Sequence, residues 1–178
     1  KLHVLHITTA KELALFTASK ELSELANKNI TAEVCAHHLF FNQADYDRLG
    51  HLIKCNPSIK TAADQQALLA AVNSGVIDII ATDHAPHTFA QKSREFDNAP
   101  FGIIGLETTL GLVLTHLVQK KVMTLSSAIR ALTDAPARAM HLPGGHLSPG
   151  APADVTLIDL KAKRTVTEFA SKSQNSPF

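Results

Sequence analysis

Residues 76 to 87 read Val-Ile-Asp-Ile-Ile-Ala-Thr-Asp-His-Ala-Pro-His, an apolar run followed at once by a carboxylate and two imidazoles. Residues 76–81 are apolar apart from Asp78, which is typical of a parallel strand buried on both faces. Residues 64–73 favour a helix that ends at Ser74-Gly75. The pattern therefore predicts a helix and then a strand, with Asp83 and His87 just beyond the carboxyl end of that strand.

The same alternation of strand and helix extends in both directions along the chain. Residues 2–7 and 30–35 are further strand candidates, and between them Thr9 and Glu12 fit a capping box at the start of a helix predicted to run to about residue 27. More helices are predicted at 106–119, 125–132 and 136–141. Strands that alternate with helices in this way favour right-handed βαβ units in a parallel sheet or a (β/α) barrel.

Polar residues follow each predicted strand, at the end where such folds place their active sites. His6 lies at the end of the first predicted strand, whereas His37 and His38 follow the second and Asp83 follows the third. A divalent ion held there lowers the pKa of bound water to about 7 and polarises a carbonyl, while a nearby carboxylate can move the proton. Taken singly, a histidine at a strand end is more often packed or hydrogen-bonded than a metal ligand, and Asp83 alone is also explained as a helix N-cap or loop residue.

Several other candidates are predicted to be structural. Adjacent residues on a strand point to opposite faces, so His37 and His38 cannot both reach one site, and His3 is expected on the opposite face from His6. Both cysteines, Cys35 and Cys55, are expected to be small buried apolar residues. The charged stretch 92–95 is expected to be a solvated loop surface.

Composition excludes some classes of function. The 178 residues carry 17 basic and 16 acidic side chains, a net charge of +1, with no Trp, so no electrostatic footprint for nucleic acid or an anionic membrane is present. No run of 18 apolar residues occurs, which argues against a membrane span. Two cysteines outside any paired motif favour a reduced, cytoplasmic setting.

Four motifs resemble those of the dihydroorotases, a family of the amidohydrolase superfamily; they cover residues 6–12, 54–60, 80–87 and 99–108. The resemblance implies that His6 and Asp83 bind metal and that Asp83 is the general acid/base. It also implies that Asn56 and His87 bind substrate, and that the backbone of Phe101 and Gly102 contacts the substrate carboxylate. Residues 58–60 are Ser-Ile-Lys where many members have Pro-Leu-Arg, and residues 35–36 are Cys-Ala where many have Thr-Pro.

The resemblance also implies a fold class. Residues 1–145 would form the C-terminal part, about strands six to eight, of a metal-dependent (β/α)₈ TIM-type barrel. Residues 146–178 would be a piece of a small β-sandwich domain, with strands at 154–160 and 164–169. The family's remaining metal ligands come from earlier strands, so the chain is interpreted as a fragment that is inactive and self-associating on its own.

The implied activity is the reversible hydrolysis of (S)-dihydroorotate to N-carbamoyl-L-aspartate in de novo pyrimidine biosynthesis, with Zn²⁺, binuclear in the full-length enzyme. The implied partners are this small substrate, further copies of the chain in a homo-oligomer, and aspartate transcarbamoylase. Two alternatives stay open. One is a hydantoinase or allantoinase, and the other is a non-catalytic partner of aspartate transcarbamoylase, against which the presence of His6, Asp83 and His87 argues.

Overall fold

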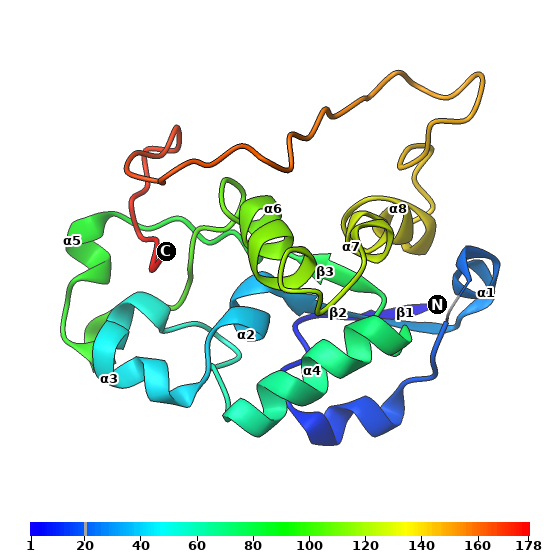
Figure 1. The fold of residues 1–178 in the computed structure, drawn as a ribbon. Coiled ribbons are helices and arrows are strands. Elements are labelled where there is room, and N and C mark those ends of the chain that lie inside the picture. The colour runs from blue at the N-terminus through cyan, green and yellow to red at the C-terminus, as the bar shows by residue number, and fades with distance from the viewer. Residues whose placement is uncertain (20) are drawn as a thin grey trace.

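Three parallel strands form the centre of the protein, in the order β1-β2-β3 (Figure 1). The structure is a computed structural model that describes residues 1–19 and 21–178. Its strands are β1 (Leu2–Val4), β2 (Ile30–Cys35) and β3 (Ile79–Ala81). Leu2 pairs with Ile30, and Glu33 pairs with Ile79. The residues that follow all three strands therefore lie at one edge of the sheet.

Helices connect the strands and cover one face of the sheet. The longest, α4 (Ala62–Ser74), begins with a capping box formed by Thr61 and Asp64 and ends at Gly75, whose φ is 77°. None of the helices in residues 1–19 and 21–178 is long and apolar enough to cross a membrane. The other helical segments are η1 (Ala10–Leu15), α1 (Leu22–Asn27), α2 (Ala36–Phe40), η2 (Gln43–Asp45), α3 (Tyr46–Leu49), η3 (Gly50–Ile53), α5 (Phe89–Lys92), η4 (Phe96–Asn98), α6 (Thr109–Leu112), the π-helical η5 (Val113–Val118), α7 (Leu125–Leu132) and α8 (Asp134–Ala139).

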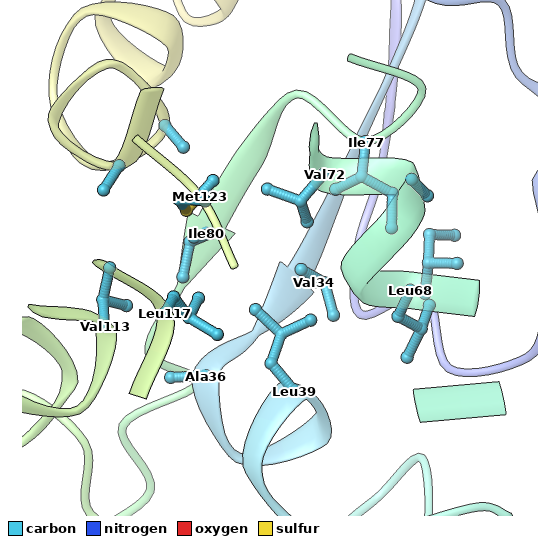
Figure 2. Close-up of a cluster of buried hydrophobic side chains, with 14 of the residues drawn as sticks. Val34, Ala36, Leu39, Leu68, Val72, Ile77, Ile80, Val113, Leu117 and Met123 are labelled. Carbon is cyan, nitrogen blue, oxygen red and sulfur yellow. The ribbon is translucent and has the colours of Figure 1, made fainter. Parts of the chain in front are cut away.

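The main core lies between the sheet and these helices (Figure 2). Val34 of β2 and Ile80 of β3 belong to it, with Leu68 of α4 and Leu117 of η5. Side chains alternate along a strand, so residues 31, 33 and 35 of β2 face the other way. That second face carries Glu33 and Cys35, which reach the histidine-bearing end of β1. One face of β2 thus builds the core and the other contributes polar groups to the site.

The predicted helix over 9–27 is two separate helices. Its capping box forms as expected, with Thr9 N donating to a Glu12 oxygen at 2.8 Å. The chain then leaves the helix at Phe16, which has extended φ and ψ of −116° and 145°, and Ser19 N donates to Gly75 O at 2.8 Å. The Ser19 N–H thus has an acceptor outside the helix and does not need one within it. Lys20 lies outside the described residues.

The predicted strands at 154–160 and 164–169 are wrong. Neither segment has strand pairing in the structure, and Leu157 is 94% exposed. A strand needs a neighbour to satisfy its backbone, and no described residue provides one. The segment runs as an open loop over the helices (Figure 1), whereas Asn175 beyond it is fully buried. The domain division between residues 145 and 146 stays a prediction.

Candidate active site

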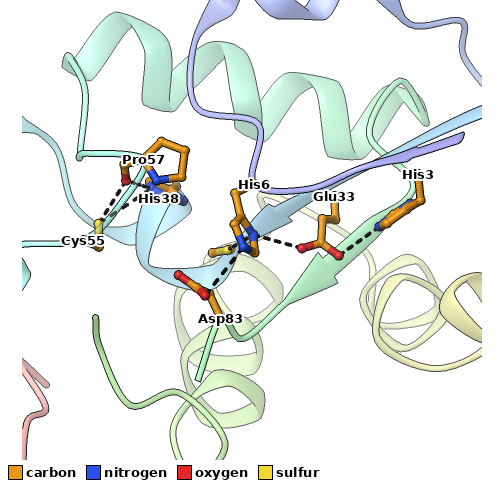
Figure 3. A network of polar contacts seen from close by, with 8 residues as sticks. His3, His6, Glu33, His38, Cys55, Pro57 and Asp83 are labelled. Carbon is orange, nitrogen blue, oxygen red and sulfur yellow. Dashed lines mark hydrogen bonds and ion pairs between the residues drawn. The ribbon is translucent and has the colours of Figure 1, made fainter. Parts of the chain in front are cut away.

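His6 lies just after β1 and uses both nitrogens of its ring (Figure 3). Its Nδ1 is 3.0 Å from a Glu33 oxygen and 3.1 Å from the Cys35 sulfur. Its Nε2 faces Asp83, at 3.5 Å from Oδ1. Glu33 therefore orients the imidazole ring through Nδ1 and leaves Nε2 directed toward the Asp83 carboxylate.

Asp83 follows β3 and approaches His6 from the neighbouring loop. Its side chain is 25% exposed. Burial raises the pKa of this carboxyl group, with the nearby His6 lowering it and the nearby Glu33 raising it further. A carboxyl group with a raised pKa is suited to accepting and returning a proton near neutral pH.

The His6–Asp83 pair fits two ligands of one divalent ion. Nitrogen and oxygen ligands lie about 2.0–2.2 Å from a tetrahedral zinc ion, so two adjacent ligands of one ion are separated by about 3.3–3.6 Å. The 3.5 Å between His6 Nε2 and Asp83 Oδ1 is close to that separation. A carboxylate such as Glu33 on the other ring nitrogen is the usual support of a metal-bound histidine. The described geometry thus suits a metal centre at this edge of the sheet.

The placement predicted for His3, on the opposite face from His6, is wrong. His3 Nε2 is 2.9 Å from the second Glu33 oxygen, and its Nδ1 is 2.8 Å from the Thr31 hydroxyl. Both histidines thus flank one carboxylate (Figure 3). The strand ends at Val4 and the backbone turns at His6, where φ is 55°, so regular alternation does not extend to His6.

His37 and His38 lie in helix α2 and not on a strand, which corrects their predicted placement. Both are almost fully buried, and His38 Nε2 is 2.9 Å from Pro57 O. Burial lowers the pKa of His38 to about 4 and that of His37 well below its ordinary value. Both rings are therefore neutral at pH 7.

A second set of side chains of ligand type, Cys35, His37 and His38, has its potential ligand atoms within 4.8 Å of one another. Burial raises the pKa of the Cys35 thiol, and the nearby Asp83 raises it further. The thiolate is the form that binds metal, so a neutral Cys35 makes this buried group the poorer candidate.

The residues predicted to contact substrate lie on three loops that meet. His87 Nε2 donates to Phe101 O at 2.8 Å, and Gly102 N donates to Lys54 O at 2.9 Å. Lys54 is two residues before Asn56, so all three predicted substrate motifs are linked. Gly102 N–H is therefore occupied within the protein. The backbone N–H of Phe101 has no acceptor among the described residues.

Two buried residues near these loops were missed by the sequence analysis. The prediction that Lys92 is solvated is wrong: its side chain is fully buried and donates to three backbone carbonyls. Burial lowers the pKa of Lys92 to about 8. Asn175 is also fully buried, between the loops of His87 and Gly102. Both act through contacts distant in sequence, which a local pattern does not reveal.

Comparison with known proteins gives a consistent family match. Residues 1–176 match the amidohydrolase family. The chain is 44% identical over 178 residues to the dihydroorotase of Geobacillus thermodenitrificans, covering 99% of this chain and 41% of that protein. It is equally similar to the dihydroorotase of Halalkalibacterium halodurans, with the same coverage. The chain therefore spans about two fifths of the length of these curated relatives.

Solved structures show the same fold. The L-hydantoinase of Arthrobacter aurescens matches with a TM-score of 0.75 at 24% identity, over 85% of this chain and 34% of that one. The dihydroorotase of Saccharomyces cerevisiae in complex with 5-fluoroorotic acid matches with a TM-score of 0.67 at 18% identity, over 79% and 38%. The predicted fold class, part of a TIM-type (β/α) barrel, is confirmed.

Proposed function

Because this chain belongs to the amidohydrolase family, we propose that it forms part of a metal-dependent hydrolase of cyclic amides, with dihydroorotate as substrate. The observation that carries the proposal is the pairing of His6 Nε2 with the Asp83 carboxylate at 3.5 Å. The dihydroorotases at 44% identity support the choice of substrate.

His6 Nε2 and the Asp83 carboxylate would hold a divalent ion, for which zinc is our proposal because imidazole and carboxylate ligands suit it. When bound, the ion would polarise the amide carbonyl and lower the pKa of a water molecule. Two ligands do not complete a zinc coordination shell. We propose that the remaining ligands, and a second ion, belong to segments of the whole enzyme outside this chain.

Asp83 would carry the proton during ring opening. The oxygen of water adds to the ring carbonyl carbon and its proton passes to the Asp83 carboxylate. The bond between that carbon and the ring nitrogen then breaks, and Asp83 returns the proton to the nitrogen. The products of this step are the ureido group of N-carbamoyl-L-aspartate and a new carboxylic acid, which releases the second proton of the water to solvent and becomes a carboxylate. Burial raises the pKa of Asp83, which supports its uptake of the proton.

Substrate recognition would use the three linked loops. Dihydroorotate differs from simple hydantoins in its carboxylate, for which we propose Phe101 N–H as donor, beside Gly102. Asn56 and His87 would orient the ring, because amide and imidazole groups can bond its carbonyls and N–H groups. Linkage of His87 to Phe101 O at 2.8 Å supports their action as one subsite.

The test is a substrate panel on the intact protein: dihydroorotate, a 5-substituted hydantoin and allantoin, each with zinc supplied. We expect turnover of dihydroorotate at the highest kcat/KM, with carbamoyl aspartate closing to the ring in the reverse direction. A preference for hydantoin or allantoin would assign the site to the related cyclic amidohydrolases. Failure to turn over any of the three would favour the non-catalytic partner of aspartate transcarbamoylase.

The remaining functional proposals follow from this substrate. We place the reaction in de novo pyrimidine (UMP) biosynthesis in the cytoplasm. We propose a homo-oligomer that can associate with aspartate transcarbamoylase, whose product is carbamoyl aspartate. Size measurement of the intact protein, alone and with the transcarbamoylase, tests both associations.

A further inference from the structure

The carbonyl oxygen of Gly102 accepts hydrogen bonds from two buried side chains. Lys92 Nζ donates to it at 2.7 Å and Asn175 Nδ2 donates to it at 3.4 Å. Both side chains belong to residues that are 0% exposed. They come from helix α5 and from the C-terminal segment, which meet at this single peptide group of the predicted substrate loop.

Lys92 connects two of the three substrate loops. Besides Gly102 O, its ammonium donates to Lys54 O at 2.8 Å and to Pro100 O at 3.1 Å. A buried ammonium is unfavourable unless it is fully hydrogen-bonded, and these three carbonyls take all three of its protons. Hydrogen bonds from a charged donor are stronger than neutral ones. The loop that leads to Asn56 and the loop of Phe101 and Gly102 are thus held against one cation.

Asn175 connects the third loop to the same point. Its Nδ2 also donates to Ala85 O at 3.0 Å, and its Oδ1 accepts from His87 N at 3.0 Å. Its own backbone carbonyl accepts from Ile104 N at 3.4 Å. All polar groups of the side chain are therefore used to fix the backbone on either side of the His87–Phe101 contact.

We propose that Lys92 and Asn175 together act as positioning residues that hold the Asn56, His87 and Phe101–Gly102 loops in the geometry that binds the substrate carboxylate. We call this pair the loop clamp. The inference rests on the proposed function for its substrate and on the hydrogen bonds at Gly102 for its structure. In the part of the chain that the structure describes, neither side chain makes a hydrogen bond or ion pair with His6 or Asp83, so the loop clamp acts on substrate binding and not on the metal ligands.

The test compares Lys92→Met, Asn175→Ala and the double variant in the intact protein. Matched controls are Lys161→Met and Gln174→Ala, whose side chains are exposed. Misplacement of a binding group by about 1 Å costs on the order of 10²-fold. We therefore expect each clamp variant to raise KM for dihydroorotate by roughly 10- to 100-fold, with kcat and zinc content changed far less. The controls should match the wild type.

The double variant tests whether the two residues act as a unit. Residues that share a partner have non-additive effects. Since either loss frees the Gly102 peptide, the double variant should raise KM by much less than the product of the two single effects. The proposal would be overturned if the increase in KM of the double variant equalled the product of the two single increases. It would also be overturned if the single variants lowered kcat and left KM unchanged.

A measurement independent of activity separates the loop clamp from the proposed function. Hydrogen exchange at the His87 and Gly102 amides should speed up in both single variants and not in the controls, because local opening exposes these amides. If Lys92→Met also speeds exchange throughout β2, the substitution has destabilised the whole protein. The test then rests on Asn175→Ala, which keeps the hydrogen bonds of Lys92. Unchanged exchange at His87 in Asn175→Ala would refute the loop clamp, even if no substrate is found. Failure of every substrate with altered exchange would refute only the proposed function.

Discussion

His6 and Asp83 face each other with Nε2 and Oδ1 3.5 Å apart, and both have a backbone φ in the left-handed region, 55° and 45°. Residues other than glycine rarely adopt this conformation, and it costs on the order of 1–3 kcal/mol per residue. The two turns direct both side chains to one point at the edge of the sheet. The backbone is therefore strained at the two positions that would bind the metal.

Replacement of Asp83 tests both the backbone strain at this position and its proposed role in the reaction. Asp83→Ala should reduce turnover of dihydroorotate by at least about 10²- to 10⁴-fold, the usual contribution of a proton-transfer residue. Asp83→Gly should be equally inactive but more stable than Asp83→Ala by roughly 1 kcal/mol, since glycine adopts positive φ without strain. Kinetics and urea unfolding of both variants measure this. Retained activity in Asp83→Ala would contradict the catalytic role.

Glu33 is expected to set the metal affinity through His6. Its carboxylate lies 3.0 Å from His6 Nδ1, so Glu33→Gln should weaken zinc binding by roughly 10- to 100-fold. Competition with a chelator measures the affinity. His3→Gln is the control, because His3 contacts the same carboxylate on the side away from the ligand; an equal loss in both variants would argue against an orienting role.

The buried His38 predicts a loss of stability in acid. Burial lowers its folded-state pKa to about 4, against about 6.5 in the unfolded chain. Above pH 6.5 both states are neutral. Between pH 6.5 and 4 only the unfolded state gains the proton, so the free energy of unfolding falls as the pH falls, by roughly 3 kcal/mol in total.

The measurement for His38 is urea unfolding from pH 7.5 to 4 with a chelator present. His38→Gln should make the free energy of unfolding less dependent on pH between 6.5 and 4, because glutamine does not titrate. The glutamine side chain can still donate to Pro57 O. His116→Gln is the control because His116 is much less buried than His38. An unchanged slope in His38→Gln would show that its burial is not the cause.

Gly102 is predicted to tolerate no side chain. Its φ is 131°, and a Cβ atom there would lie 2.5 Å from the Ala85 Cβ. Gly102→Ala should therefore raise KM for dihydroorotate and destabilise the protein by on the order of 1–3 kcal/mol. Gly111→Ala, in helix α6 with no atom within 4 Å of its added Cβ, should instead stabilise by roughly 0.5–1 kcal/mol. Wild-type kinetics in Gly102→Ala would contradict the tight loop contact.

Local signals predicted much of the fold. The sequence predicted β2 and α7 with the bounds they have in the structure, since apolar runs and helix caps act over a few residues. The capping box of Thr9 and Glu12 was also predicted, but not the end of its helix at Leu15. That break depends on Gly75 O, a partner more than fifty residues away.

The candidate site shows the same limit. His6 and Asp83 were predicted from motifs at strand ends, and the structure brings them together. The roles of Glu33, Lys92 and Asn175 were not predicted, because each depends on backbone or side-chain partners from other segments. Solvation was the reasonable expectation for a lysine in a charged loop, and only the three converging carbonyls explain its burial.

Asn175 is translated well after the loops to which it bonds. It bonds to Ala85 O, a partner 90 positions earlier in the chain. At a synthesis rate of about 5–20 residues per second, the ribosome makes Asn175 roughly 5–18 seconds after Ala85. The predicted substrate loops are therefore made several seconds before this side chain, and the hydrogen bonds that join them to it can form only after that interval.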